Sequence, residues 1–504
     1  MSLLLSVSPS AFGQGGQDFR LSDLKLDFTL FSASIGSGAR ALAMGGSFIA
    51  IADDGTAASW NPAGLGVLEE AELSLNWQPL LDENLTKPST RVVAALPVLG
   101  AEPLFGDTGE TRLERSGKTV DFVSFAMPTR FKGRKLVPQF SYQRVIPSLD
   151  AYFEGGRSVF VTACAIDCRE QTAFESSAFL EASGGIDVYA GSLGIDFGER
   201  LLVGASLNWW RGDSTTRLVD TTTELSSGRD FRDDDAEETE TRFFNTFERT
   251  ETLSGFSVNL GAIVTPAHWA RVGVVFKTPF HMRRVFQERF EASELTRNLN
   301  EPPPLSWRAT FSESTTTSEG DIDWPATLGV GFAWLPASVA TISTDFTWTN
   351  WSEARTIEES TTTTSNLEST SSQIESSYPA PNQVDAWQYR LGAELVVIQP
   401  SFAKLAAIPL RGGFFLDRQY FLDFQSNRSL NRGFSAGVGL VWRRFTLDIA
   451  YVHTFGEREP AARVQELPLG VVPGTDGTFG AFKQEGGKAH FSSHQVLVST
   501  IVRF

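Results

Sequence analysis

The amino-acid sequence predicts an all-β protein, a 14-stranded antiparallel transmembrane β-barrel that follows an N-terminal segment without regular strands. Three observations lead to this fold class. From about residue 70, apolar and polar residues alternate with a period of two, in paired segments joined by tight turns. Short turns alternate with long polar connections, and the chain closes on an apolar stripe that ends at Phe504. Soluble β-sandwiches also alternate, but they do not sort their connections by length, so an outer-membrane barrel is favoured.

The composition fits strands better than a helical core. The 504 residues suffice for several soluble domains or for one large barrel. Phe occurs 39 times and Trp 12 times against only 4 Met, and such an aromatic excess is typical of the girdles at the interfaces of a membrane barrel. The longest uncharged apolar run, residues 41–52, is too short for a membrane helix. A membrane role must therefore be carried by strands.

The charge balance argues against nucleic acid as a partner. Lys and Arg number 43 against 60 Asp and Glu, which gives a formal charge of −17, whereas phosphate binding needs a basic surface. The acidic excess is concentrated in polar connections such as residues 233–240, which read DDDAEETE. Such a run is interpreted as a solvated loop, with a divalent-cation site as the alternative.

Residues 1–13 are interpreted as the remnant of a signal peptide. A short apolar core from Leu3 to Val7 is followed by a small-x-small cleavage site at residues 11–13. The basic residues that usually precede such a core are missing, so we expect the precursor to begin further upstream. Three parts are then expected: the remnant at residues 1–13, an N-terminal subdomain at residues 14–69 and the barrel at residues 70–504.

The stretch from residue 36 to residue 65 has no strand-like alternation and precedes the regular strands. Asp53 and Asp54 are predicted to cap a helical turn, and Asn61 to cap a second turn that begins at Pro62. Glycines interrupt an apolar run that would otherwise form a helix or a buried strand: Gly36, Gly38, Gly45 and Gly46. On these features alone, the stretch is a compact subdomain of tightly packed small residues.

Three motifs occur in this stretch in a fixed order: G-A-R-A-L-A-M-G-G at residues 38–46, I-A-D-D at residues 51–54 and W-N-P-A-G-L at residues 60–65. Together they resemble the N-terminal hatch of the FadL-type outer-membrane transporters of long-chain fatty acids and other hydrophobic compounds. The resemblance implies that residues 14–69 are the hatch, a plug inside the lumen of a 14-stranded barrel. Its motif residues would be Gly45, Gly46, Asp53, Asp54, Asn61, Pro62 and Ala63. The PorV-like barrels of the type IX secretion system share a similar motif, so a scaffold for secreted proteins is the alternative.

The predicted strands pair as hairpins. Before residue 350 they are residues 120–130 with 136–145, 189–197 with 201–210, 256–264 with 271–279, and 327–335 with 339–349. Their tight turns are predicted at residues 132–134, 198–200, 265–266 and 336–337. Residues 387–395, 408–417, 434–442 and 445–451 continue the pattern, and in the first of these Trp387 and Tyr389 face away from Arg390.

With residues 71–77 at one end and 494–504 at the other, these segments give an even set of fourteen strands. Residues 90–97 are a further candidate, but a single-chain bacterial barrel has an even number of strands, so this short, proline-ended segment is rejected. The connections at residues 211–252, 281–323, 351–385 and 456–491 are predicted to be long polar loops.

The second half of the chain supports the same resemblance. Residues 324–332, 344–352, 389–394 and 409–415 look like strand motifs of the FadL family. The last strand carries an apolar stripe that ends at Phe504, which resembles the C-terminal signal of bacterial outer-membrane proteins. We therefore expect an integral protein in the lipid of the outer membrane of a Gram-negative-type bacterium, with the barrel assembly machinery as a partner.

Cys164 and Cys168 are the only cysteines. In an exported chain, two cysteines this close together are expected to form a small disulfide that staples a loop. A metal site is the alternative, but it would need two more ligands nearby, and the histidines lie far away in the sequence.

No catalytic, metal or cofactor site is expected, and the protein is not expected to be an enzyme. The five histidines are scattered, and neither a nucleophile elbow nor a phosphate-binding loop is present. The spacing of His490 and His494 is interpreted as incidental, with metal ligation as the alternative. Some outer-membrane lipases carry Ser/His sites on a barrel wall, but no residue pair here suggests one.

Charged side chains on the predicted lumen-facing phase are the candidate contacts of the hatch or of a ligand, because they would be costly on the lipid face. They are Lys277, Arg390, Glu394, Arg411 and Asp417. One role is to hold the hatch, and the other is to receive a ligand carboxylate by charge-assisted hydrogen bonds.

Taken with the resemblance, these features lead us to expect that hydrophobic small molecules, such as fatty acids, bind inside the barrel and pass inward when the hatch moves. A water-filled pore gives apolar molecules no favourable path. An internal apolar cavity would favour uptake, whereas a tightly filled lumen would favour the PorV-like scaffold.

Overall fold

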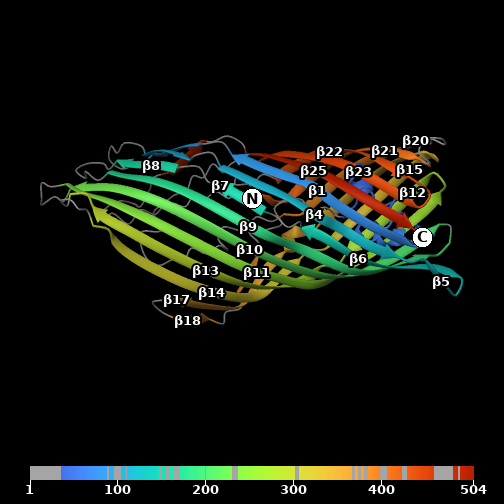
Figure 1. Ribbon diagram of the computed structural model, residues 1–504, viewed down its shortest axis with the longest axis horizontal. Helices are drawn as coiled ribbons and strands as arrows, with labels where there is room; N and C mark the ends of the chain where they lie inside the picture. Colours follow the sequence, from blue (N-terminus) through green and yellow to red (C-terminus); the bar gives the residue numbers. More distant parts are fainter. Residues whose placement is uncertain are drawn as a thin grey trace.

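The computed structural model of the protein is a long tube of strands (Figure 1). It describes residues 36–87, 90–95, 104–108, 111–146, 150–154, 158–163, 171–198, 200–229, 236–300, 306–365, 369–372, 376–379, 384–397, 406–422, 428–458, 481–485 and 489–504. The predicted signal-peptide remnant, the first part of the predicted hatch and the Cys164–Cys168 disulfide lie outside these residues. Within them, every helix is too short or too polar to cross a membrane.

Fourteen strand positions form a closed antiparallel ring, which confirms the predicted fold class. In ring order they are β1 (Glu72–Lys87), β4 (Thr111–Ala126), β6 (Arg134–Ile146), β9 (Gln171–Asp196), β10 (Leu201–Arg229), β11 (Ala236–Ala267), β12 (Ala270–Lys277) with β13 (Phe280–Asn298), β14 (Arg308–Trp324) with β15 (Thr327–Ala337), β16 (Ala340–Thr349) with β17 (Arg355–Ser365), β20 (Ala386–Val397), β21 (Ile408–Leu422), β22 (Arg428–Val441), β23 (Phe445–Arg458) and β25 (Ala489–Arg503). β25 pairs with β1 and closes the ring.

Short strands add to the ring without entering it. They are β2 (Thr90–Ala95), β3 (Leu104–Thr108), β5 (Thr129–Phe131), β7 (Asp150–Glu154), β8 (Ser158–Ala163), β18 (Ser369–Ser372), β19 (Ser376–Pro379) and β24 (Ala481–Glu485). β2 pairs only with β3 and β24 among the described strands, so the rejection of residues 90–97 as a spanning strand is confirmed.

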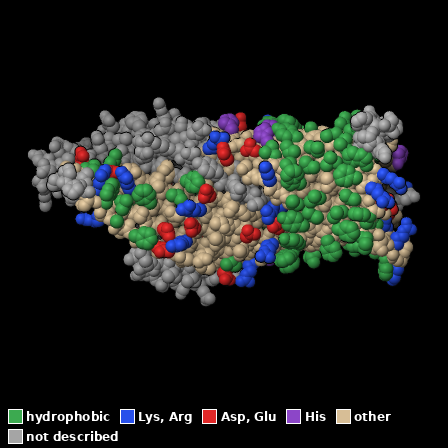
Figure 2. Space-filling view, viewed as in Figure 1, with side chains coloured by type: hydrophobic (Ala, Val, Ile, Leu, Met, Phe, Trp, Pro, Cys, Tyr) green, Lys and Arg blue, Asp and Glu red, His purple; other side chains and the backbone are tan. Residues whose placement is uncertain are grey.

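An apolar band surrounds one half of the tube. On β15, Leu328, Val330, Phe332 and Trp334 are exposed, while Ala333 between them is fully buried against the interior. On the face seen in Figure 2, the band appears as green side chains over the half of the tube that contains the C-terminus. Neighbouring strands place Tyr142, Tyr189 and Trp209 side by side, with ring centroids 5.5 Å apart at each step. An apolar band with interfacial aromatic residues is the lipid-facing surface of a membrane-spanning barrel.

Two of the predicted turns are wrong by two or three residues. β11 runs past the predicted turn at residues 265–266 and ends at Ala267. β15 includes residues 336–337, which were predicted as a turn, and ends at Ala337. In both hairpins the register shifts just before the end, between Val264 and Ala267 and between Trp334 and Ala337. Each shift contains Pro266 or Pro336, and a bulge accommodates a proline that cannot donate to the ladder.

The predicted loops at residues 211–252, 281–323 and 351–385 are largely strand, which corrects the prediction. The β10–β11 ladder is unbroken from Leu201↔Val264 to Arg229↔Ala236, and β13 and β14 continue it side by side. Thr, Phe and Val in these segments favour strands, and a paired neighbour supplies every backbone hydrogen bond. We call the parts of β9, β10, β11, β13, β14 and β17 beyond the apolar band the outer sheet; it forms the other half of the tube (Figure 1).

A line of breaks crosses three neighbouring positions where the band meets the outer sheet. β12 and β13 are separated at Thr278 and Pro279, and β14 and β15 at Pro325 and Ala326. Beside them, the helix η4 (Trp351–Glu353) separates β16 from β17. Pairing is intact on both sides of the line, since Lys277 pairs with Thr327 and Phe280 with Trp324. The prolines remove donors at the places where the wall bends.

Residues 36–68, which we call the hatch segment, fill the lumen inside the apolar band. The segment contains α1 (Ala39–Ala43), α2 (Ala57–Trp60) and the 3-10 helix η3 (Pro62–Val67). Met44, Phe48 and Trp60 are at most 1% exposed, and the rings of Phe48 and Trp60 meet edge to face with centroids 6.0 Å apart. The segment therefore packs as a small core against the wall.

Candidate functional site

The glycines of the hatch segment let its backbone touch the wall. Gly45 and Gly46 follow α1 with φ of 68° and 77°, the left-handed region that favours glycine. Their N–H groups donate to the carbonyls of Leu42 and Ala41, which ends the helix. On the wall, a Cβ added at Gly413 would lie 2.0 Å from the nitrogen of Gly45. Glycine is thus required on both sides of this contact.

Asn61 joins the hatch segment to two strands of the wall. Its Nδ2 donates to the carbonyl oxygens of Ile49 (3.0 Å), Ala262 (3.2 Å) and Val274 (3.4 Å). Its Oδ1 accepts from the N–H of Ala63 at 3.1 Å, so the side chain caps η3, with Pro62 in its first turn. Asn61 is fully buried, and one amide side chain satisfies backbone groups of the hatch segment, β11 and β12.

The predicted capping role of Asp53 and Asp54 is wrong for α2. The N-cap of α2 is Thr56, which makes no side-chain capping bond. Asp54 instead accepts hydrogen bonds from the N–H (2.9 Å) and hydroxyl (2.6 Å) of Thr56 in the turn before the helix. Asp53 forms ion pairs instead: its carboxylate lies 2.5 Å from the guanidinium of Arg40 and 3.6 Å from that of Arg271 of β12.

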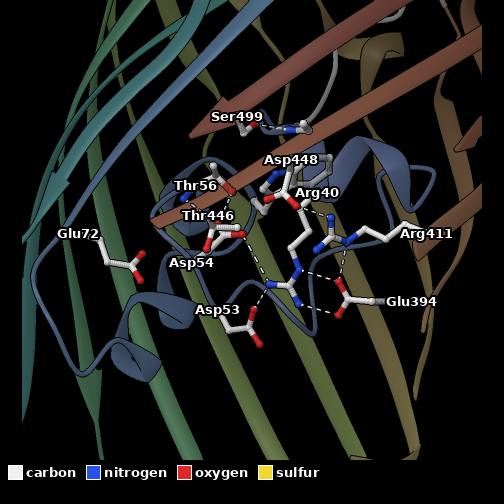
Figure 3. A network of polar contacts seen from close by, with 12 residues as sticks. Arg40, Asp53, Asp54, Thr56, Glu72, Glu394, Arg411, Thr446, Asp448 and Ser499 are labelled. Atoms are coloured by element: carbon white, nitrogen blue, oxygen red, sulfur yellow. Dashed lines mark hydrogen bonds and ion pairs between the residues drawn. The ribbon is translucent and has the colours of Figure 1, made fainter. Parts of the chain in front are cut away.

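A chain of ion pairs fastens α1 to the wall (Figure 3). Nε and Nη2 of Arg40 donate to the two carboxylate oxygens of Glu394 on β20, at 3.0 and 3.1 Å. Arg411 of β21 donates to the same carboxylate at 2.6 Å and to Asp448 of β23 at 2.5 Å. We call Arg40, Asp53, Glu394, Arg411 and Asp448 the charge clamp. Side chains of Arg40 and Asp53 remain about one-fifth exposed, whereas the wall residues are buried.

A second contact holds the chain after α1. Arg390 of β20 donates to the carbonyl of Gly45 at 3.0 Å and pairs with Asp417 of β21 at 3.2 Å. Asp345 of β16 accepts the N–H groups of Phe48 and Ile49 at 2.6 and 2.8 Å. Of the candidate lumen charges, Arg390, Glu394, Arg411 and Asp417 thus surround the hatch segment.

Sequence reasoning missed three residues of these contacts: Arg40, Asp345 and Asp448. Asp345 and Asp448 are acidic residues on the inner phase of apolar strands, which was a usable signal. Arg40 lies inside the first hatch motif, and no alternation marks which way its side chain points.

A cavity of about 160 Å³ lies directly over α2, where Ala58 and Ser59 form part of its floor. The line of strand breaks borders it, since Thr278, Pro325 and Trp351 belong to its lining. Aromatic rings stand in sequence along one side. Centroid distances are 5.2 Å for Trp210–Phe280, 5.5 Å for Trp324–Trp351 and 4.3 Å for Trp351–Tyr420. We call this cavity the aromatic pocket.

Lys277 is the predicted lumen residue that lines the aromatic pocket. Arg418 is the other cationic residue of the lining, and its guanidinium lies 5.5 Å from the ring of Trp387. The described lining contains no Asp or Glu. Amides and hydroxyls, such as those of Asn208, Ser257 and Gln388, complete the polar part.

Metal binding finds no support in the described part of the chain, where no group of three or more His, Cys, Asp or Glu could hold an ion. His453 and His494 stack with centroids 4.4 Å apart, and Tyr451 lies 2.7 Å from Nδ1 of His494. His490 lies four register rows away from that pair, opposite Glu457.

Neither a protein-family model nor a curated protein matches the chain. Solved structures with a similar course over most of the chain include a Pseudomonas aeruginosa FadL homologue, with 14% identity, a TM-score of 0.46 and coverage of 93% of this chain and 98% of that one. The Pseudomonas putida toluene transporter TodX has 13% identity, a TM-score of 0.47 and coverage of 94% and 99%. The Ralstonia pickettii toluene transporter TbuX has 14% identity, a TM-score of 0.42 and coverage of 94% and 100%. The first is, by its description, of the group that the hatch motifs resemble.

Proposed function

We propose that the protein takes up hydrophobic small molecules across the outer membrane, by binding them in the aromatic pocket and releasing them inward when the hatch segment moves. The observation that carries this proposal is the position of the pocket, which lies in the lumen with the hatch segment as its floor. A ligand in the pocket is removed from water and is in contact with the hatch segment. A water-filled channel would give an apolar molecule no favourable path. Contact with the aromatic walls of the pocket stabilises such a molecule instead.

The size of the aromatic pocket limits what it can enclose. An apolar cavity of about 150 Å³ binds benzene, so about 160 Å³ accommodates a single ring or one end of a longer chain. Lys277 suits a carboxylate at that end. Monoaromatic compounds and the head of a long-chain fatty acid are therefore the two ligand types we propose.

Movement of the hatch segment is the second half of the proposal. The charge clamp and Asn61 hold the segment through polar contacts, and few side chains interlock across Gly45 and Gly413. Polar contacts can exchange for water as the segment shifts, because Arg40 and Asp53 already face solvent in part.

A matched pair of tryptophans tests the pocket. Trp324 lines the pocket, whereas Trp334, on the same strand position, faces the lipid. In nanodiscs that hold the full chain, Trp324→Ala should weaken binding of labelled toluene about tenfold or more, since a stacked ring contact and its buried area are lost. Trp334→Ala should leave it unchanged. Equal binding by both variants would rule out the aromatic pocket as the site.

Lys277→Met separates the two ligand types. It should weaken decanoic acid, whose carboxylate loses its cation, and leave toluene binding intact. If both ligands bind as before, Lys277 does not receive the carboxylate.

The PorV-like scaffold remains the second candidate because its hatch motif is similar. The cavity above α2 favours uptake over this alternative, since a scaffold needs no internal cavity lined by aromatic rings. Retention of an endogenous secreted protein by the purified barrel, without uptake of either ligand, would favour the scaffold.

A further inference from the structure

The wall of the aromatic pocket carries a group of polar side chains on β10, β11 and β12. Asn208 of β10 pairs in register with Ser257 of β11. Asn259, two residues further along β11 on the same face, pairs with Lys277 of β12. All four side chains line the pocket, and we call them the polar cluster. Trp210, the first ring of the aromatic side, lies two residues beyond Asn208 on the same face of β10.

Hydrogen bonds fix one part of the polar cluster. The hydroxyl oxygen of Ser257 accepts from Nδ2 of Asn208 at 3.2 Å and from Nε1 of Trp210 at 2.8 Å. These bonds tie the amide of Asn208 to the aromatic side of the pocket. The polar cluster and the first aromatic ring therefore form one continuous surface.

Asn259 differs from its neighbours because its amide is unused. The residue is 8% exposed, and neither Nδ2 nor Oδ1 has a hydrogen-bond partner in the part of the chain that the structure describes. Neither atom is sealed inside the wall, so both open into the pocket that the residue lines. By contrast, Asn61 uses both atoms of its amide. Because a buried amide without partners is costly, a molecule that enters the pocket must supply them.

The chemistry of an amide decides which group fits. Nδ2 donates and Oδ1 accepts, side by side. A hydroxyl is the small neutral group that satisfies both, because it accepts from the nitrogen and donates to the oxygen. A carboxylate only accepts, and a methyl group does neither. The amide of Asn259 thus matches a hydroxyl better than an acid or a hydrocarbon.

We propose that Asn259 makes the aromatic pocket selective for hydroxylated single rings, such as phenol, over hydrocarbon rings of the same shape. The ring packs against Trp210, Phe280 and Trp324, whose centroids lie within 6.0 Å of one another, and its hydroxyl exchanges two hydrogen bonds with Asn259. The inference rests on the proposed function for the site and names its substrate class. A site built to hydrogen-bond a hydroxyl disfavours the analogue without it, since the polar group of the site is then left unpaired.

Phenol and toluene are the matched ligands, because a hydroxyl in one replaces a methyl group of similar size in the other. Their dissociation constants are measured with the full chain in nanodiscs, after subtraction of binding to empty nanodiscs. Asn259→Leu keeps the volume without the amide, so it should weaken phenol binding about tenfold and leave toluene binding unchanged or tighter. Asn431→Leu is the control and should change neither, because Asn431 is also a buried asparagine with an unpartnered Nδ2 among the described residues, but lies outside the lining.

A second variant tests whether the neighbouring cation could account for the preference instead. Lys277→Met keeps the amide of Asn259, so its preference for phenol over toluene should match wild type. Loss of the preference in Lys277→Met would assign the hydroxyl to Lys277 and overturn the inference. Equal phenol binding by Asn259→Leu and wild type would also overturn it and leave water as the partner of the amide. Migration of unheated samples on gels checks that each variant is folded.

Uptake by cells that express the protein separates this inference from the proposed function. Selective binding of phenol without uptake of either ligand would refute the proposed function and leave the selectivity of Asn259 standing. Uptake of both ligands with equal binding, unaffected by Asn259→Leu, would support the proposed function and refute the selectivity.

Discussion

At the scale of single residues, the hatch segment depends on a few polar side chains with several partners each. Asn61 serves three carbonyls and one N–H, in a lumen where water is scarce. Asn61→Ala leaves these groups without partners, so we expect a loss of about 1–3 kcal/mol from hatch docking, with the barrel intact. Protease sensitivity of the hatch segment and ligand uptake should both change while surface expression does not. Wild-type values for both would make Asn61 only a turn residue.

The close contact at Gly413 gives a sharper residue-scale prediction. An added Cβ would lie 2.0 Å from the backbone nitrogen of Gly45, so Gly413→Ala must displace the hatch segment or the strand, at a cost of about 1–3 kcal/mol or more. Gly191→Ala is the control, because nothing lies within 4 Å of its Cβ position. Faster hydrogen exchange in residues 36–68 of the Gly413 variant alone is the expected result. Equal exchange in both would place the hatch segment further from the wall than described.

At the scale of elements, the distal end of the outer sheet is held by Glu240 on β11. Desolvation of its carboxylate raises its pKa, but hydrogen bonds from Arg297 and Arg242 outweigh this, and the net pKa is lowered. The ion pairs therefore stabilise the β11–β13 pair fully above about pH 4.3, the value of an unpaired Glu, and this contribution is lost as the pH falls through the lower folded pKa.

Hydrogen exchange in β11 and β13 measures this dependence. When the pH falls from 6 to 3, the wild-type amides near Glu240 should exchange faster than the change in intrinsic exchange rate explains. The Glu240→Gln variant should be less protected than wild type at pH 6, and its protection should show no such acid-dependent loss. The same Gln substitution at Glu248, which is half-exposed, should change little. A pH profile of Glu240→Gln that matches wild type would show that the ion pairs do not hold this end of the sheet.

At the scale of the whole molecule, alternation was enough to predict the closed ring, because the lipid face tolerates so few polar residues. The same pattern hid the outer sheet: Ser-, Thr- and Glu-rich segments read as loops, although a continuous ladder pairs them. The charges Arg390, Glu394 and Arg411 were found because the inner phase of a strand is visible in the sequence. The aromatic pocket was not found, since Trp210, Trp324 and Tyr420 meet only after the ring closes.

The barrel makes a molecule-scale prediction. Folded protein should migrate differently on gels before and after boiling and should show mainly β circular dichroism. Deletion of Phe504, which is exposed at the seam and donates its N–H to Ala71, should lower membrane insertion with little effect on the folded ring, since it follows β25. A helical spectrum, or solubility without detergent, would contradict the fold.

The line of strand breaks has a mechanical consequence. On the side of the apolar band, β12, β15 and β16 pair with one another without interruption. On the side of the outer sheet, β13, β14 and β17 are joined to these strands by short connections. β9, β10 and β11 run through both halves without interruption, so they act as a spine. A load applied to the distal half will flex the tube about this spine at the bends. The apolar band and the hatch segment inside it are thereby shielded from forces that act on the far end.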